Sequence, residues 1–363
     1  MYPVLLVGAG KIGSAVAKFL ADTGDYDVLV VDVDRAALDR VEAETGVRTA
    51  VADVMDPAQL AGAMAGRKAA LSAVSFAQNP AIAAGALEHG LSYFDLTEDV
   101  ATTRATRGLG EKARPGQVFM PQCGLAPGFV SIAAHALAEQ FDTLSDVRLR
   151  VGALPVFPTN DMKYNLTWTT DGLINEYGNP CEAIHEGRLI RILPLEGLEH
   201  FSLDGVDYEA FNTSGGVGTL AETLEGKVHT LNYKTIRYRG HRALMKFLMV
   251  DLHMNEHRAQ LKEIFERAVP MTLQDVVLIF CTVKGRQGGR YVERTDARKV
   301  YAGEFRGQTC SAIQMTTAAA LCAVLDMHVA GQLPDQGFVR QEQVPLADFL
   351  ANRFGAAYDV PTK

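Results

Sequence analysis

A glycine-rich segment near the N-terminus carries the clearest chemical signal in the sequence. Gly8, Gly10 and Gly13 have the spacing GxGxxG and stand between an apolar run and a segment with helical periodicity. In such a turn the glycines allow a tight bend, the approach of a pyrophosphate to backbone N–H groups, and close packing of helix against strand. Asp32 ends the next apolar run, where a carboxylate can accept both hydroxyls of a ribose. Together these residues predict a dinucleotide site.

The carboxylate of Asp32 also bears on which nicotinamide dinucleotide is bound. It would repel a 2′-phosphate, so NAD is favoured over NADP, although Arg35 nearby keeps NADP open. Asp53 follows a third apolar run, and a contact with the adenine edge and a capping role in its own turn are equally compatible with the sequence. The other cofactor contacts that we predict are Lys11, Ile12, Val54 and Ser75.

Strands and helices alternate over the first 125 residues. Asp56-Pro57 and Asn79-Pro80 are typical helix starts, and glycines such as Gly46 and Gly90 are typical helix ends. The alternation predicts a parallel, doubly wound sheet of the Rossmann type, within an α/β protein. Its strands are expected at residues 4–7, 28–31, 47–52, 71–74, 92–96 and 118–120.

From about residue 126 the pattern changes to longer alternating runs with hairpin turns at Glu186-Gly187, Asp204-Gly205 and Gln287-Gly288-Gly289. A mostly antiparallel sheet is predicted, with strands at 147–151, 164–168, 189–193, 230–238, 276–283 and 290–294. Helices are expected at 128–140, 241–254, 256–267, 314–328 and 347–354. We therefore predict a nucleotide-binding domain (1–125), an α+β substrate domain (126–310) and C-terminal helices (311–363) that return to the first domain, with the substrate in a cleft between the domains.

Composition limits the classes of function. Lys plus Arg number 35 and Asp plus Glu 43, for a formal charge of −8, so a broad nucleic-acid surface is not expected. The five cysteines are widely spaced without a CxxC pair, which favours a reducing cytoplasm and predicts neither disulfides nor a metal site. The N-terminal apolar run is too short for a signal peptide, and the stretch 318–330 is interrupted by Asp326 and His328, so no contact with a membrane is predicted.

Four segments in order resemble the saccharopine dehydrogenase superfamily, and within it most closely the lysine 6-dehydrogenases. They are VGAGKIGSAVAKFL (7–20), SAVSFAQNPAIAAGALEHGLSYFDLTED (72–99), CGLAPGFVS (123–131) and YKTIRYRGH (233–241). The resemblance implies an N-terminal NAD(P) domain, a substrate and dimerisation domain, a homodimer or larger homo-oligomer, and hydride transfer at a carbon bearing an amino or imino nitrogen. For lysine 6-dehydrogenases it implies NAD-dependent oxidation of the side-chain amine of L-lysine. Saccharopine reductases tend to have an acid where Ala126 stands, so their dicarboxylate substrate is less expected here.

An amino-acid substrate with two ammonium groups needs an anion, a cation and a base in the site. For the anion we predict Glu98, with Asp95 second; the alternative is that strand-end acids only cap local turns. For the substrate carboxylate we predict Arg237 and Arg242, against the alternative of a solvated face.

The leading candidate for the base is His241, because imidazole titrates near neutral pH, and Lys234 is second. Cys123 is expected to line the nicotinamide pocket as a small apolar group and not as a nucleophile. Tyr164 and Trp168 could wall a lysine chain or pack in a core, and Asn212 begins either a nest of backbone donors or a plain loop.

Two other functions remain open from the sequence. One is reductive condensation of an amine with a carbonyl compound, as saccharopine and carboxynorspermidine dehydrogenases perform. The other is a non-catalytic NAD-binding sensor or scaffold.

Overall fold

The computed structural model describes residues 1–360, which form two compact units. The first unit contains Met1–Phe129, Glu304–Gln308 and Gln314–Asp359, and the second contains Val130–Gly303 and Thr309–Ile313. Each unit has its own sheet, and the α/β class expected from the sequence is confirmed.

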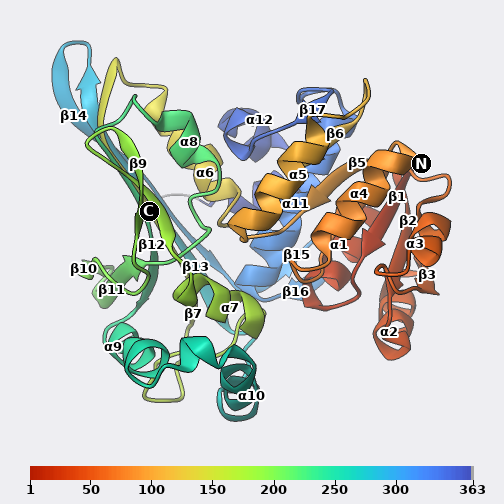
Figure 1. Ribbon diagram of the computed structural model, residues 1–363, viewed down its shortest axis with the longest axis horizontal. Coiled ribbons are helices and arrows are strands. Elements are labelled where there is room, and N and C mark those ends of the chain that lie inside the picture. The colour runs from red at the N-terminus through yellow and green to blue at the C-terminus, as the bar shows by residue number, and fades with distance from the viewer. Residues whose placement is uncertain (361–363) are drawn as a thin grey trace. The chain divides into compact units, whose positions relative to one another are not determined.

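The first unit is built on a seven-stranded parallel sheet in the order β17-β6-β5-β4-β1-β2-β3 (Figure 1). Both faces of the central part of such a sheet are buried, which explains why most of its strands are continuous apolar runs. The edge strand β3 is an exception, since none of its residues is buried. The strands are β1 (Tyr2–Val7), β2 (Tyr26–Asp32), β3 (Arg48–Val51), β4 (Ala69–Ser72), β5 (Ser92–Asp95), β6 (Val118–Met120) and β17 (Gly337–Phe338). The helices between them are α1 (Lys11–Ala21), α2 (Arg35–Thr45), α3 (Pro57–Met64), α4 (Asn79–His89) and α5 (Val100–Gly110). The predicted Rossmann arrangement is confirmed, and β17 is an additional edge strand.

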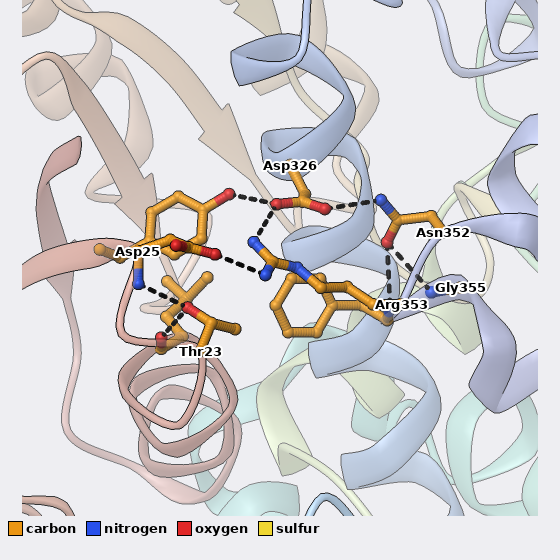
Figure 2. A network of polar contacts seen from close by, with 9 residues as sticks. Thr23, Asp25, Asp326, Asn352, Arg353 and Gly355 are labelled. Carbon is orange, nitrogen blue, oxygen red and sulfur yellow. Dashed lines mark hydrogen bonds and ion pairs between the residues drawn. The ribbon is translucent and has the colours of Figure 1, made fainter. Parts of the chain in front are cut away.

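Within the first unit, a polar network around Asp326 of α11 (Ala312–Val329) connects the C-terminal segment to the N-terminal part, as Figure 2 shows. The Asp326 carboxylate accepts hydrogen bonds from Tyr26 at 2.5 Å, Arg353 at 2.6 Å and Asn352 at 2.8 Å. Arg353 also pairs with Asp25 at 2.6 Å. Because Tyr26 and Asp25 lie at the start of β2, the network joins α11 and the region after α12 (Leu346–Ala351) to the Rossmann sheet. Residues 361–363 of the predicted C-terminal segment lie outside the described residues.

By length and composition α11 is apolar enough to cross a membrane, but 72% of its 18-residue window is buried inside the structure. A core helix of a globular domain has the same properties. Short 3-10 turns at Gln341–Gln343 and Gly355–Tyr358 flank α12, and a small hairpin of β15 (Gly303–Phe305) and β16 (Gln308–Cys310) precedes α11.

The second unit is built on an eight-stranded sheet in the order β10-β11-β12-β7-β13-β14, with β8 pairing β12 and β9 pairing β8. Its strands are β7 (Thr143–Pro155), β8 (Cys181–His185), β9 (Arg188–Ile192), β10 (Glu199–Leu203), β11 (Val206–Asn212), β12 (Thr230–Tyr238), β13 (Asp275–Gln287) and β14 (Arg290–Tyr301). All pairs are antiparallel except β7–β12, which is parallel. The helices are α6 (Phe129–Ala138), α7 (Thr170–Gly178), α8 (Leu220–Leu224), α9 (His241–Lys246) and α10 (Arg258–Ala268).

Two predictions for the second unit were wrong. Residues 164–168 are a loop with one isolated bridge between Leu166 and Met271, not a strand. The alternation of Tyr164 and Trp168 reflects packing in a buried cluster that also contains Leu173 and Phe265. The helix expected over 241–254 ends its α-helical part at Lys246, passes into a π-helical turn (Phe247–Asp251), and is followed by a 3-10 turn (Met254–Glu256).

Candidate functional site

The glycine turn between β1 and α1 has the geometry of a nucleotide-binding loop. Gly8 has a φ of +106°, and a Cβ atom there would lie 2.8 Å from the Ala73 carbonyl oxygen. A Cβ atom on Gly13 would lie 1.9 Å from the Gly8 carbonyl oxygen. A Cβ atom on Gly10, the exposed residue that precedes α1, would meet nothing within 4 Å. The fold itself therefore requires Gly8 and Gly13, whereas Gly10 leaves open space at a helix N-terminus, where a diphosphate fits.

Asp32 is held beside this turn by the backbone. Its Oδ2 accepts a hydrogen bond from the Ala9 N–H at 2.7 Å, and its Oδ1 accepts one from the Asp34 N–H at 3.0 Å. A carboxylate has about four acceptor positions, so two remain for a pair of ribose hydroxyls. Arg35 lies along its own helix, 3.4 Å from Asp39. A dinucleotide thus fits the residues of the turn and the end of β2.

The remaining predicted cofactor residues follow strand ends or begin α1. Asp53 is exposed, and its Oδ1 accepts from the Met55 N–H at 2.9 Å, so it does cap its own turn, while the adenine contact stays a prediction. Lys11 and Ile12 are half-buried at the start of α1; Val54 is buried, and Ser75 is exposed in the loop after β4.

Asp95, at the end of β5, is completely buried. It accepts hydrogen bonds from the Tyr93 hydroxyl at 2.9 Å and from the N–H groups of Thr97 and Gln122 at 3.0 Å each. Burial raises the pKa of Asp95 to about 6, with these hydrogen bonds acting in the opposite direction. Through these contacts Asp95 connects β5 to the segment after β6. A buried carboxylate in this role is poorly placed to bind a substrate ammonium group. Glu98 is half-buried in the loop between β5 and α5.

Cys123 lies after β6 and is also fully buried. Its thiol donates to the Met120 carbonyl at 2.9 Å and accepts from the Gln341 side chain at 3.2 Å. Burial, reinforced by the charge of Asp95, raises the pKa of the Cys123 thiol well above its usual value. A thiol in this state is a poor nucleophile. That Cys123 lines the nicotinamide pocket stays a prediction.

A buried polar cluster forms in the second unit around Arg237, on the β12 face that meets α7. Arg237 Nε donates to the Tyr177 hydroxyl at 2.8 Å, and this hydroxyl lies 3.1 Å from His241 Nε2. His241 Nδ1 lies 2.9 Å from the Met162 carbonyl oxygen, which can only accept. Nδ1 therefore carries the proton, and Nε2 accepts from Tyr177. The Arg237 guanidinium lies over the Tyr164 ring, 5.0 Å from its centroid.

This geometry counts against His241 as the base. Both ring nitrogens are hydrogen-bonded, and the residue is completely buried. Burial, followed by the charge of Arg237, lowers the pKa of His241 to about 3. A group with that pKa is a weak proton acceptor near neutral pH, where a base with a pKa near 7 is needed.

We predict that His241 instead makes the fold sensitive to acid. The unfolded chain takes up a proton at this histidine below pH 6.5, whereas the folded chain does so only near pH 3. The unfolding free energy should therefore fall by about 1.4 kcal/mol per pH unit from this group as pH drops below 6.5, and be unaffected above it. Urea unfolding of the wild type and His241→Gln at several pH values measures the difference. His89→Gln, at an exposed histidine, is the control; equal slopes in wild type and His241→Gln would contradict the prediction.

The other predicted substrate residues do not join the Arg237 cluster. Lys234 and Arg237 lie on opposite faces of β12 because side chains alternate along a strand. Lys234 instead contacts the Gly197 carbonyl at 2.5 Å. Arg242 is bound to Glu196 at 2.8 Å. The Asn212 side chain donates to the Leu193 carbonyl at 3.2 Å, and Trp168 packs half-buried beside the hydrophobic cluster of the 164–168 loop.

Sequence reasoning missed two features of the Arg237 cluster. Tyr177 lies on α7, a helix that was not predicted, so nothing singled it out. Three buried atoms of the neighbouring loop lack a hydrogen-bond partner within residues 1–360: Tyr164 Oη, Asn165 Oδ1 and Thr167 Oγ1. Buried polar groups are nearly always satisfied, so these atoms point to a polar ligand group or water at this loop, and Tyr164 is the one of the three residues whose ring contacts Arg237. No group of three or more His, Cys, Asp or Glu side chains that could hold a metal occurs in the described chain.

Comparison with known proteins identifies the family to which the chain belongs. Residues 4–120 match the saccharopine dehydrogenase NADP binding domain, and residues 124–355 match the saccharopine dehydrogenase C-terminal domain. Apo saccharopine dehydrogenase (L-Glu forming) from Saccharomyces cerevisiae has a similar fold: the TM-score is 0.78 at 15% identity, covering 98% of this chain and 96% of that one. A myo-inositol dehydrogenase from Corynebacterium glutamicum gives a TM-score of 0.46 at 13% identity, covering 98% and 92% of the two chains. The chain therefore belongs to the saccharopine dehydrogenase family, whose members are nicotinamide-dependent oxidoreductases that act on CH–NH groups.

Proposed function

We propose that the protein catalyses NAD-dependent oxidative deamination of the side-chain amine of L-lysine or a close analogue. Bound NAD would accept the hydride from the carbon that carries the amine. The main support for binding of a nicotinamide dinucleotide is the position of Asp32, whose Oδ2 lies 2.7 Å from the Ala9 nitrogen of the glycine turn.

The choice of NAD over NADP depends on the same carboxylate. The matching family domain is named for NADP, but a 2′-phosphate next to Asp32 would meet a negative charge. Arg35, the nearest cation in sequence, lies beside Asp39 on α2 and offsets this charge little. In this proposal the N-terminus of α1 at Gly10 binds the diphosphate and Asp32 binds the ribose.

The proposed anchor for the substrate carboxylate is Arg237. Its planar guanidinium suits a carboxylate, and burial makes such a pair stronger than it would be in water. Burial works to lower the pKa of Arg237, but Tyr177, Tyr164 and Glu176 together outweigh it and raise this pKa, so the cation persists. Glu98 remains the proposed partner of a substrate ammonium group.

Assays with purified protein separate this proposal from its alternatives. Steady formation of NADH from NAD on addition of L-lysine supports it. If turnover occurs only as NADPH oxidation in the presence of an amine and a carbonyl compound, the function is reductive condensation and not oxidation of lysine. Tight NAD binding without turnover across an amino-acid panel would indicate a sensor or scaffold.

The unpartnered hydroxyl of Tyr164 gives a sharp test of the substrate site. We expect Tyr164→Phe to leave the unfolding free energy unchanged or slightly higher, because this hydroxyl has no hydrogen-bond partner in the described chain. If the hydroxyl binds substrate, the KM for L-lysine should rise about tenfold, the effect of losing one hydrogen bond to a charged group. Tyr208→Phe is the matched control, because Tyr208 pairs with Tyr238 and therefore lies on the sheet face opposite Arg237. An unchanged KM in Tyr164→Phe would remove this loop from the substrate site.

The proposal also includes a homodimer or larger homo-oligomer, which light scattering would measure. The five cysteines are all buried free thiols, which supports a reducing compartment such as the cytoplasm.

A further inference from the structure

The sheet of the second unit curls until its edge strand β10 faces β13 and β14. The rings of Phe201 on β10 and Phe280 on β13 are stacked, with centroids 6.4 Å apart and planes 17° apart. Asp204, in the β10–β11 turn, pairs with Lys299 of β14 at 2.5 Å. Since β11, β12 and β7 stand between β10 and β13 in the strand order, these contacts require a strongly curved sheet.

The curled face forms a partly open cavity of about 280 Å³ lined by residues of β7, β10, β13 and β14. Arg148 and Arg150 of β7 lie opposite Thr282 and Phe280 of β13, so alternation along the strands places all four on this face. Arg237 lies on the other face of the sheet, because it alternates with the residues of β12 that share the cavity face. The cavity is therefore distinct from the proposed substrate site.

The charges around the cavity do not balance. Glu199 forms ion pairs with two cations, Arg150 at 2.5 Å and Lys234 at 3.0 Å. Lys284 pairs with Glu293 at 2.5 Å, and Arg148 pairs through Nε with Asp146 at 2.6 Å. Four cations thus face three carboxylates, which leaves one positive charge in excess.

Arg148 is the cation best placed to receive a ligand. Its side chain is 46% exposed, whereas that of Arg150 is 6% exposed and also donates to the Leu149 carbonyl at 2.8 Å. The pairing of Arg148 with Asp146 uses Nε, so the outer edge of its guanidinium is available to a bidentate partner. Phe201 and Phe280 supply an apolar wall in the same cavity.

We propose that this cavity binds a small organic monoanion, a carboxylate carried on an aromatic or branched aliphatic body. The carboxylate would pair with Arg148 and neutralise the excess charge, and the body would pack against Phe201 and Phe280. Small-molecule sites commonly combine an apolar wall with a few charged groups in this way. This site goes beyond the proposed oxidation of an amine, and it needs no residue of that reaction.

The test uses the full-length protein and para-fluorobenzoate as probe, followed by fluorine NMR. We expect saturable binding to the wild type, and no binding of the neutral analogue para-fluorobenzamide. Arg148→Gln should weaken binding about tenfold, as expected for loss of a charge-assisted pair. Arg188 is an exposed arginine of β9, and the Arg188→Gln variant should bind para-fluorobenzoate as tightly as the wild type.

A second variant and a competition experiment locate the probe. Phe201→Leu alters only the apolar wall. It should therefore weaken para-fluorobenzoate binding, and the variant should still bind para-fluorobenzoate but not the neutral para-fluorobenzamide. Excess L-lysine should not displace the probe. Equal affinity in wild type and Arg148→Gln, displacement by L-lysine, or absence of binding to the wild type would each overturn the proposal. None of these outcomes depends on whether the protein oxidises an amine.

Discussion

Replacing Asp32 with alanine is expected to raise the KM for NAD by about a hundredfold, with a much smaller change in kcat. The carboxylate is proposed to accept two ribose hydroxyls, and each hydrogen bond to a charged group contributes about 1.5–3 kcal/mol. The contact is far from the reacting carbon of the nicotinamide ring, so its loss weakens binding of the ground state and the transition state alike.

The same substitution should reduce discrimination against NADP, because the charge that repels a 2′-phosphate is removed. Steady-state kinetics with both cofactors measures the ratio of the two kcat/KM values. Asp22→Ala, at an exposed carboxylate at the other end of α1, is the matched control. Asp32→Asn retains an acceptor for the Ala9 N–H and separates loss of charge from a disturbed turn. A KM for NAD close to that of the wild type would remove Asp32 from the ribose site.

Most of the first unit could be predicted from the sequence because its central strands are buried on both faces. Runs such as 4–7 and 28–31 are apolar throughout. The first is followed by the glycine turn that begins α1, and the second by a helix with an aspartate cap. Asp56 does cap α3, as predicted, and Asp34 caps α2 in the same way. By contrast, β17 has only two residues, Gly337 and Phe338, and no periodic pattern. It becomes a strand because β6 offers it an edge, which is information about tertiary structure.

In the second unit the hairpins could be predicted from the sequence, but which distant strands pair with each other could not. β12 has the predicted bounds, 230–238, and the three predicted turns all join adjacent antiparallel strands. The parallel pairing of β7 with β12 brings together segments about 80 residues apart in sequence, which local patterns do not specify. Residues 164–168 alternate like a strand because their apolar side chains enter one core, and this signal does not distinguish a buried loop from a strand.

Some residues of the candidate site could be predicted from the local sequence, and others could not. The glycine turn and Asp32 form a motif whose residues contact one another in the fold. The spacing of the glycines, together with the apolar runs and the helical periodicity around them, was enough to predict that they lie together. His241 was chosen for the ordinary pKa of imidazole, but its behaviour depends on burial and on Arg237, and neither effect is visible in the sequence. Arg237 was paired with Arg242 by proximity, whereas the structure places only Arg237 in the buried cluster.

A pair of glycine substitutions separates the needs of the fold from those of the cofactor. In Gly13→Ala the new methyl group would lie 1.9 Å from the Gly8 carbonyl oxygen, so the turn must move. We expect this overpacking to cost about 3 kcal/mol of unfolding free energy and to abolish NAD binding. In Gly10→Ala the methyl group meets nothing within 4 Å, and the change in unfolding free energy should stay below about 1 kcal/mol.

Gly10→Ala should nevertheless weaken NAD binding at least tenfold. The open space beside Gly10 lies at the N-terminus of α1, and a methyl group there would hold a diphosphate away from the backbone N–H groups, whose hydrogen bonds to an anion are worth about 1.5–3 kcal/mol each. Thermal unfolding of the apo proteins and calorimetric titration with NAD measure the two effects independently. Gly62→Ala, at an α3 position where a Cβ atom also meets nothing within 4 Å, controls for loss of a glycine. A stable Gly10→Ala protein that binds NAD like the wild type would show that the diphosphate does not lie at this turn, and the assignment of Asp32 to the ribose would fail with it.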